Sequence, residues 1–303
     1  MRLLNVMQKF YKVEFYITQI RIKLGTILLK IDTKNGIDIV SVPVKEIELG
    51  PNHQFKYTLS IFAIFKDEEK YLKEWIDFHL KQGVAHFYLY DNESSDKSIE
   101  ILKKYSPETI TIYNWPSCFG NGGQTIALAH AISVFKMETE WLLHIDIDEF
   151  VFARKNISLI DVINSNSNVE CMILSWRCFG PSGHSDAPVG SVLENYLDMA
   201  DLDYASDKMK YELTRTKALF KAHKIVTVHV HNPEVAGAKI NISEQIILNH
   251  YVTRSENEFY TKIGRAHPWS NTNLLDSWRK KRIEMFEFLK KYHKPNVEII
   301  SRR

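Results

Sequence analysis

The 303-residue sequence is 45% hydrophobic and 25% charged, and its 39 Lys and Arg against 37 Asp and Glu leave a formal charge of +2. This balance excludes a general nucleic-acid-binding protein, which carries a strong basic excess, and three Cys are too few for a disulfide scaffold or a zinc ribbon. The sequence holds no uncharged apolar run of roughly 18 residues, so no membrane-spanning segment is expected.

Residues 1–57 are expected to form a small β-rich extension. Two β-branched runs flank Asn35-Gly36, a dipeptide that favours the tight turn of a β-hairpin. Loop-forming residues at 49–54 mark the end of this segment. The predicted domains are therefore the N-terminal extension 1–57, a main domain 58–270, and a basic C-terminal helix and tail 271–303.

The main domain begins with alternating strand and helix patterns. The strands are expected at 58–65, 86–92, 109–115 and 140–152, and the helices between them at 66–83, 94–105 and 123–138. Strict alternation of this kind predicts an α/β fold with a mostly parallel sheet, right-handed crossovers and flanking helices.

The second half has a mixed pattern. Further strands are expected within 171–180, 217–233 and 244–252, a loop at 181–190, and helices at 191–203, 254–267 and 276–293. The last helix is amphipathic, with Trp278 and Phe286 beside basic residues. The basic ends of the chain would suit anionic lipid headgroups, while a packed helix with solvated lysines explains the same pattern.

Two carboxylates follow the apolar run that ends the fourth strand. Asp146 and Asp148 are separated by one residue, so in an extended strand they would project to the same face. Ligand sites of open α/β sheets lie beyond the carboxyl ends of the strands. Paired carboxylates repel each other unless a cation lies between them, and Mn²⁺ or Mg²⁺ prefers oxygen ligands and can bridge carboxylate to phosphate.

Several motifs together resemble a known family. They are Lys66–Trp75 with His79, Gly83-Val84, His86–Asn92 with Asp96, Asp146–Phe150, Trp176 with Phe179-Gly180, Gly183-His184, Val192–Tyr196, Asn249–Tyr251, Arg254-Ser255 and Glu258-Phe259. Between about residues 60 and 264 the chain resembles the family-2-like glycosyltransferases grouped with glycosyltransferase family 92. The resemblance implies a GT-A-like, Rossmann-like fold. Asp67 departs from it, because the family usually has Asn there.

The resemblance implies a metal site and a nucleotide site. Asp146 and Asp148 would hold Mn²⁺ or Mg²⁺, and His250 is the expected third ligand, with His229 and His231 as alternatives on one strand face. The residues expected near the nucleotide-diphosphate are Lys66, Glu68, Asp91, Gln124, Asp146 and Arg254, with Lys262 as a further candidate. The glycine-rich segment 120–129 is expected to be a flexible turn that brings Gln124 to this pocket.

An inverting transfer needs a carboxylate base for the acceptor hydroxyl. Glu194 is the first candidate and Asp186 the second, while Glu149, next to the metal pair, is better suited to an orienting role. Trp176, Phe179 and His184 are expected to line the acceptor site, because aromatic faces stack on the apolar side of sugar rings.

The expected function is a metal-dependent transfer of a sugar from a nucleotide-diphosphosugar, with a UDP-hexose as the leading donor, to a glycan or lipid-linked glycan. The enzyme is expected to be a cytoplasmic hexosyltransferase of polysaccharide or lipopolysaccharide biosynthesis, possessing at most a peripheral contact with an anionic membrane and no nucleic-acid partner. The alternative is a non-catalytic carbohydrate-binding or scaffolding protein on the same frame.

Overall fold

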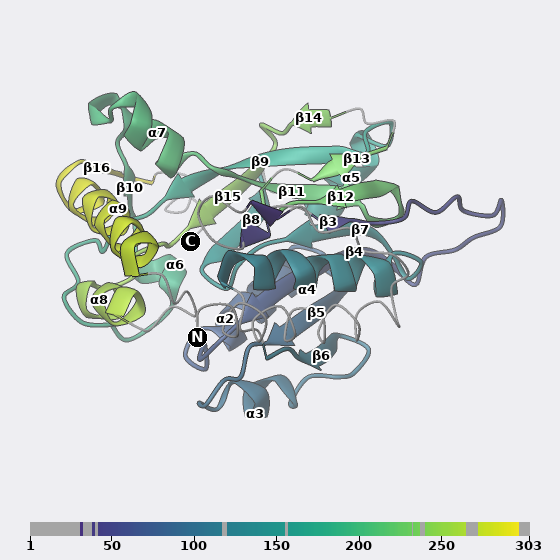
Figure 1. The fold of residues 1–303 in the computed structure, drawn as a ribbon, viewed down its shortest axis with the longest axis horizontal. Helices are drawn as coiled ribbons and strands as arrows, with labels where there is room; N and C mark the ends of the chain where they lie inside the picture. The colour runs from purple at the N-terminus through teal and green to yellow at the C-terminus, as the bar shows by residue number, and fades with distance from the viewer. Residues whose placement is uncertain are drawn as a thin grey trace, which may run out of the picture.

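The computed structural model describes residues 31–32, 38–39, 42–116, 120–154, 157–231, 233–236, 240–264 and 272–296. In these ranges, no helix has the length and apolar character needed to span a bilayer. The dominant element is a nine-stranded sheet in which eight strands follow the order β6-β5-β4-β7-β11-β9-β15-β8 and β14 pairs with β9 off this path. Figure 1 shows the sheet with helices on both sides.

The first part of the sheet is parallel and follows the predicted alternation. In chain order its elements are β4 (Tyr57–Phe65), α2 (Leu72–Lys81), β5 (His86–Asp91), α3 (Ser98–Leu102), β6 (Ile110–Asn114), α4 (Gly120–Phe135) and β7 (Thr139–His144). Strand β4 pairs in parallel with both β5 and β7, and β5 pairs in parallel with β6. The predicted α/β architecture is therefore confirmed.

Both faces of these strands are buried. In β4, Leu59 and Ile61 pack on the side of α2, whereas Phe62 packs on the side of α4. All three side chains are fully buried, as the continuous apolar run predicts for a strand covered on two faces. The segment expected to be a flexible turn at 120–129 is instead the start of α4, because its residues from Ile126 onward are apolar on all sides and pack into this core.

The second part of the sheet is mixed. It contains β8 (Glu149–Ala153), β9 (Cys171–Cys178), β11 (Thr216–Lys221), β14 (Ile240–Ile242) and β15 (Ile246–His250). Strand β11 runs antiparallel to β7 and to β9, and β15 runs parallel to β9 and antiparallel to β8. The strands expected in 171–180, 217–233 and 244–252 are thus present.

The single strand expected at 140–152 is two strands, β7 and β8. The chain turns between them, where the backbone N–H of Glu149 donates to the carbonyl oxygen of Asp146 at 3.1 Å. Strand β8 then leaves β7 and pairs with β15 over five residues. The two predicted metal-binding carboxylates therefore lie in a turn and not along one strand.

The prediction of a single helix at 191–203 is also wrong. The segment forms α6 (Val192–Asn195), β10 (Asp198–Ala200) and η1 (Leu202–Tyr204). A capping box between Ser191 and Glu194 starts α6, but β10 ends the helix by pairing antiparallel with β16 (His293–Pro295) near the end of the chain. This long-range pairing has no local signal in the sequence.

The remaining helices and short strands surround the sheet. They are α5 (Leu159–Ser165), α7 (Asp207–Leu213), η2 (Ala222–Lys224), β12 (Ile225–Val228), β13 (Glu234–Val235), α8 (Glu256–Gly264) and α9 (Thr272–Lys291). Before the main domain, β1 (Ile31–Asp32) pairs antiparallel with β2 (Asp38–Ile39), as the two arms of the expected hairpin would, and its Asn35-Gly36 turn lies outside the described residues. Strand β3 (Val42–Pro43) pairs with β12.

Helix α9 is packed against the body of the protein. Phe286 and Leu289 are fully buried, and a Cβ atom added at Gly180 would lie 3.0 Å from the carbonyl oxygen of Leu289. Glycine at this position therefore allows α9 to approach closely. The apolar side of the helix is thus used inside the protein, as the packed-helix alternative predicts.

Candidate active site

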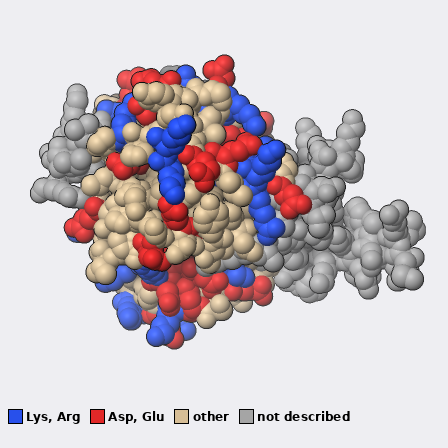
Figure 2. All heavy atoms as spheres, turned by 90° about the vertical axis from the view of Figure 1, so that its left-hand side faces the viewer, with Lys and Arg blue, Asp and Glu red and all other residues tan. Residues whose placement is uncertain are grey.

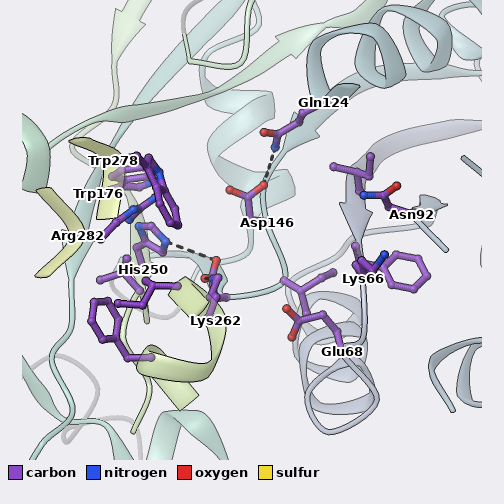
Figure 3. A pocket seen from close by; sticks show the side chains of 17 residues that line it. Lys66, Glu68, Asn92, Gln124, Asp146, Trp176, His250, Lys262, Trp278 and Arg282 are labelled. Atoms are coloured by element: carbon purple, nitrogen blue, oxygen red, sulfur yellow. Dashed lines mark hydrogen bonds and ion pairs between the residues drawn. The ribbon is translucent and has the colours of Figure 1, made fainter. Parts of the chain in front are cut away.

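A cavity of about 390 Å³ opens beyond the carboxyl ends of β4, β5 and β7. One wall comes from the segments after β4 and β5 and from α4, and it contains Lys66, Glu68, Asn92 and Gln124. The opposite wall comes from β9, β15, α8 and α9, and it contains Trp176, His250, Lys262, Trp278 and Arg282. Asp146 lies between the two walls (Figure 3), and Asp148 also lines the cavity.

Asp148 is the most enclosed carboxylate of the cavity. Its Oδ1 lies 3.4 Å from Nε2 of His250, and its Oδ2 accepts a hydrogen bond of 2.6 Å from Nζ of Lys262. Burial by itself raises the pKa of Asp148, but Lys262 and His250 hold that pKa well below its usual range. Burial lowers the pKa of His250, so the imidazole is neutral at pH 7 and available as a metal ligand.

Asp146 faces a different set of partners. Its Oδ1 accepts a hydrogen bond of 2.7 Å from the Gln124 amide, and its Oδ2 lies 2.9 Å from Nζ of Lys217. The shared direction expected for Asp146 and Asp148 is therefore wrong, because the turn after β7 sends each carboxylate to its own neighbours. Of the three predicted metal ligands, the structure brings together Asp148 and His250.

Glu149 is fully buried beneath this turn. Its Oε2 accepts the backbone N–H of Asp146 at 2.8 Å and lies 3.6 Å from Nζ of Lys217. Burial raises the pKa of Glu149 well above its usual range. A buried carboxyl that fixes the backbone of Asp146 fits the orienting role.

Glu68 and Arg254 form an ion pair that links the segment after β4 to the segment after β15. Glu68 Oε2 lies 2.9 Å from Nη1 of Arg254, whose guanidinium stacks 3.6 Å from the ring centre of Tyr71. Arg254 has φ +52°, a left-handed conformation that few non-glycine residues adopt. Tyr71 in turn donates to Glu258 of α8. Glu68 lines the cavity. Arg254 is not among the lining residues and contacts the cavity only through its ion pair with Glu68.

The end of β5 contributes Asn92 to the cavity wall, while the predicted nucleotide contact Asp91 is used locally. Asp91 Oδ1 accepts the backbone N–H of Ser94 at 3.0 Å. Asp67, which departs from the family pattern, has φ +53° and accepts hydrogen bonds from the backbone and hydroxyl of Ser95. Asp and Asn both tolerate this conformation, so the departure keeps the loop geometry.

Neither predicted base lines the cavity. Glu194 is exposed in the capping box of α6, where its Oε2 lies 3.5 Å from the backbone nitrogen of Ser191. Asp186 is exposed and accepts a hydrogen bond of 2.7 Å from the Asn257 amide.

Of the three residues predicted to line the acceptor site, only Trp176 is among the residues that line the cavity. Trp176 lines the cavity and packs against His250 with 4.3 Å between ring centres. Phe179 is buried against Tyr251, and a ring nitrogen of His184 lies 3.2 Å from the carbonyl oxygen of Asn195.

The alternative metal ligands lie behind Trp176. His231 Nδ1 is 2.8 Å from the carbonyl oxygen of Thr216, and Nδ1 of His229 accepts the backbone N–H of His231. Neither His229 nor His231 is among the residues that line the cavity.

The site also contains residues that were not predicted from the sequence, among them Lys217, Asn92, Trp278 and Arg282. Lys217 is the second residue of strand β11, and no local pattern indicates that its buried charge pairs with a residue far away in the chain. Trp278 and Arg282 stand one helical turn apart on α9, which placed them on one face, but nothing local indicated that this face meets the cavity.

Within the described residues, Asp148 and His250 are the pair of side chains best placed to hold a cation. No group of three His, Cys, Asp or Glu side chains in the described ranges is arranged to hold a metal ion. Asp148 and His250, a carboxylate beside a neutral imidazole, are nevertheless donors that suit Mn²⁺. A site built on this pair leaves the remaining coordination positions to water or to a bound ligand.

Comparison with solved structures gives only distant similarity. S. aureus TarS, residues 1–349 in complex with UDP, is 15% identical, with 77% of this chain and 70% of that chain covered and a TM-score of 0.39. Glucosyl-3-phosphoglycerate synthase from Mycobacterium tuberculosis, in complex with Mn²⁺, UDP and phosphoglyceric acid, is 14% identical, with 56% and 57% covered and a TM-score of 0.31.

Comparison with curated proteins identifies relatives in plants. A glycosyltransferase family 92 protein of Oryza sativa subsp. japonica is 29% identical over 202 residues, which are 64% of this chain and 33% of the rice protein. One of Arabidopsis thaliana is 24% identical over 239 residues, 74% of this chain and 40% of that protein. The chain thus spans about a third of the length of the curated relatives it matches.

The sequence profile of glycosyltransferase family 92 matches residues 56–294. The chain therefore belongs to glycosyltransferase family 92.

Proposed function

We propose that this chain transfers a sugar from a nucleotide-diphosphosugar to a glycan or lipid-linked glycan, with a divalent metal and with inversion at the sugar. The observation that carries the proposal is the pairing of Asp148 and His250, whose Oδ1 and Nε2 atoms lie 3.4 Å apart inside the cavity. Membership in glycosyltransferase family 92 supports the reaction class. A UDP-hexose is the donor we favour.

In this proposal Asp148 and His250 hold Mn²⁺ or Mg²⁺. When bound, the metal neutralises the diphosphate and stabilises the charge on the leaving group. Lys262, which lines the cavity and donates to Asp148, would be a further candidate contact for a phosphate. Asp146, held by Gln124 and Lys217, keeps a fixed position beside this pair and offers an acceptor to the ribose hydroxyls.

The nucleotide is proposed to lie along the wall formed by the ends of β4 and β5. Lys66 is exposed on this wall and is a candidate contact for a phosphate, and Asn92 offers amide hydrogen bonds to a base. Gln124 and Glu68 complete the wall. Asp91 would act indirectly, by fixing the loop that carries Asn92.

The base that takes the acceptor proton is proposed to be Glu194. Glu194 matches the family pattern at residues 192–196 and is exposed, whereas the carboxylate of Asp186 is held by a 2.7 Å hydrogen bond from Asn257. An exposed carboxylate at this position could meet an acceptor that docks over α6. Asp186 remains the second candidate.

Contact with an anionic membrane is a weaker part of the proposal. On the face that carries α8 and α9, Figure 2 shows basic and acidic side chains interspersed. Since Phe286 and Leu289 are buried and cannot insert into a bilayer, the proposed contact relies on the basic side chains of α9. Flotation with anionic liposomes at low salt tests it, and absence of binding removes it. A cytoplasmic location stays a prediction.

The alternative is a non-catalytic protein that binds a carbohydrate or nucleotide-sugar on this frame. A screen of UDP- and GDP-sugars with Mn²⁺, with release of free UDP or GDP as the readout, separates the two functions. We expect metal-dependent release from at least one UDP-hexose and none after chelation by EDTA. Binding of a nucleotide-sugar without release, in the presence of candidate acceptors, would favour the non-catalytic alternative.

A further inference from the structure

The charges of the cavity do not balance. Each of its three carboxylates already has a basic partner from the protein, because Asp146 is paired with Lys217, Asp148 with Lys262 and Glu68 with Arg254. Two cations that line the cavity, Lys66 and Arg282, have no carboxylate within ion-pair distance in the part of the chain that the structure describes.

These two cations lie on opposite walls. Lys66 follows β4 on the nucleotide wall, whereas Arg282 projects from α9 beside Trp278, Trp176 and His250 (Figure 3). A nucleotide-diphosphosugar and a divalent metal carry opposite charges that offset each other. Lys262 remains the partner of Asp148 and Lys66 is available for the diphosphate, so Arg282 is left facing a second anion.

The surroundings of Arg282 also differ from those of Lys66. Lys66 is exposed, whereas Arg282 is only half-exposed and burial lowers its pKa. A guanidinium cannot lose its proton in a protein, so this partly desolvated charge favours an anionic partner. Its fork of N–H donors matches a carboxylate or a phosphate group.

The same wall presents aromatic surface. The Arg282 guanidinium lies 5.5 Å from the ring centre of Trp278, one helical turn earlier, and Trp176 lines the cavity close by. Indole faces stack on sugar rings, and the neighbouring guanidinium would bind an acidic substituent of such a ring.

From this arrangement we infer that Trp278 and Arg282 form an acceptor subsite for an acidic sugar, one that carries a carboxylate or a phosphate. The inference rests on the proposed transferase function and adds the chemical class of the acceptor. Arg282 is then a specificity-determining residue that distinguishes acidic from neutral acceptors.

The test measures binding to the full chain, by saturation-transfer NMR and by tryptophan fluorescence, since Trp278 is part of the subsite. The probes are galactose, galacturonate and galactose 6-phosphate, each with and without UDP and Mn²⁺. We expect at least one acidic sugar to bind about tenfold more tightly than galactose, as a charge-assisted hydrogen bond would give. A carboxylate source and a phosphate source are distinguished by which probe shows the preference.

Variants separate this subsite from the donor site. Arg282→Gln should abolish the preference for the acidic sugar and leave the affinity for UDP with Mn²⁺ within about twofold. Lys281→Gln, an exposed position of the same helix, is the matched control and should change neither. If the wild-type protein binds acidic and neutral sugars equally well, the inference is overturned without any variant. Tenfold weaker UDP binding in Arg282→Gln, with the preference retained, also overturns it and assigns Arg282 to the donor.

The proposed function fails separately, if the wild-type protein binds no nucleotide with Mn²⁺. The comparison of acidic with neutral sugars can still be made in that case, because it is also measured without nucleotide. An acidic-sugar preference without nucleotide binding would keep the subsite and remove the transferase function on which its role as an acceptor site depends.

Discussion

Lys217 and Asp146 come from opposite halves of the sheet, and Nζ of Lys217 lies 2.9 Å from Oδ2 of Asp146. The lysine side chain is 1% exposed, and it also lies 3.6 Å from the fully buried Glu149. A charge this deeply buried is stable only when it is paired. The first carboxylate of the proposed metal turn is therefore held by a cation from β11.

Replacing Lys217 by Met should cost about 3 kcal/mol of unfolding free energy, because Asp146 and Glu149 would lose their shared cation. Urea denaturation measures the change. Lys210→Met, at an exposed position on α7, is the control and should change stability by less than about 0.5 kcal/mol. Equal stabilities of the two variants would show that Lys217 does not hold the turn.

The Glu68–Arg254 pair should behave as a partly buried unit. Arg254 both pairs with Glu68 and stacks on Tyr71, which a lysine cannot do in the same geometry. A double-mutant cycle with Glu68→Gln and Arg254→Lys should give a coupling energy above about 1 kcal/mol. The exposed Lys73–Asp77 pair on α2 is the matched control and should give about 0.5 kcal/mol or less. Coupling no larger than that of the control contradicts this view of Arg254.

His79 should make the protein sensitive to acid. It is fully buried, one ring nitrogen lies 2.8 Å from the Trp75 carbonyl oxygen and the other accepts the backbone N–H of Val151, and burial lowers its pKa from 6.5 to about 3. The neutral form is favoured by folding, so its stabilisation is complete above pH 6.5 and is lost as pH falls toward 3.

This prediction is tested by measuring the free energy of unfolding as a function of pH. His79→Gln should reduce the slope between pH 6 and 4 by about 1.4 kcal/mol per pH unit. Part of the slope should remain, because burial also lowers the pKa of His223 and of His231 to about 4. A slope identical to that of the wild type would mean that His79 does not titrate in this way.

The choice of base can be decided by two variants. Glu194→Gln should lower kcat for transfer by about 100-fold or more, the range of general-base catalysis, while UDP still binds with Mn²⁺. Asp186→Asn should stay within about threefold of the wild type, since its carboxylate is held by Asn257 and not by a reacting group. The reverse pattern would transfer the role to Asp186, and two active variants would exclude both residues.

The parallel half of the fold was predictable because its signal is local. The apolar run ending at Phe65 and the helical pattern around Trp75 lie within single elements, and alternation of such elements implies a parallel sheet. The turn at Asp146 was predictable as a site but not in its geometry. The split between β7 and β8 depends on pairing with β15, about a hundred residues away.

The cavity wall formed by α8 and α9 was likewise only partly predictable from the sequence. His250 was found because a family motif surrounds it, whereas Arg282 and Lys217 have no motif and become site residues only through long-range packing. Glu194 was chosen because it matches a family pattern and Asp186 because it lies in the preceding loop, and the fold leaves both outside the cavity lining.

The most direct test of the account is calorimetric titration of UDP into the full chain, with and without Mn²⁺, for the wild type and for Asp148→Asn. The amide keeps the shape of the side chain but lacks the charge that the metal needs. We predict Mn²⁺-dependent UDP binding to the wild type and at least about tenfold weaker binding to the variant. Mn²⁺-independent binding of UDP, or equal affinities of the two proteins, would contradict the proposed metal site.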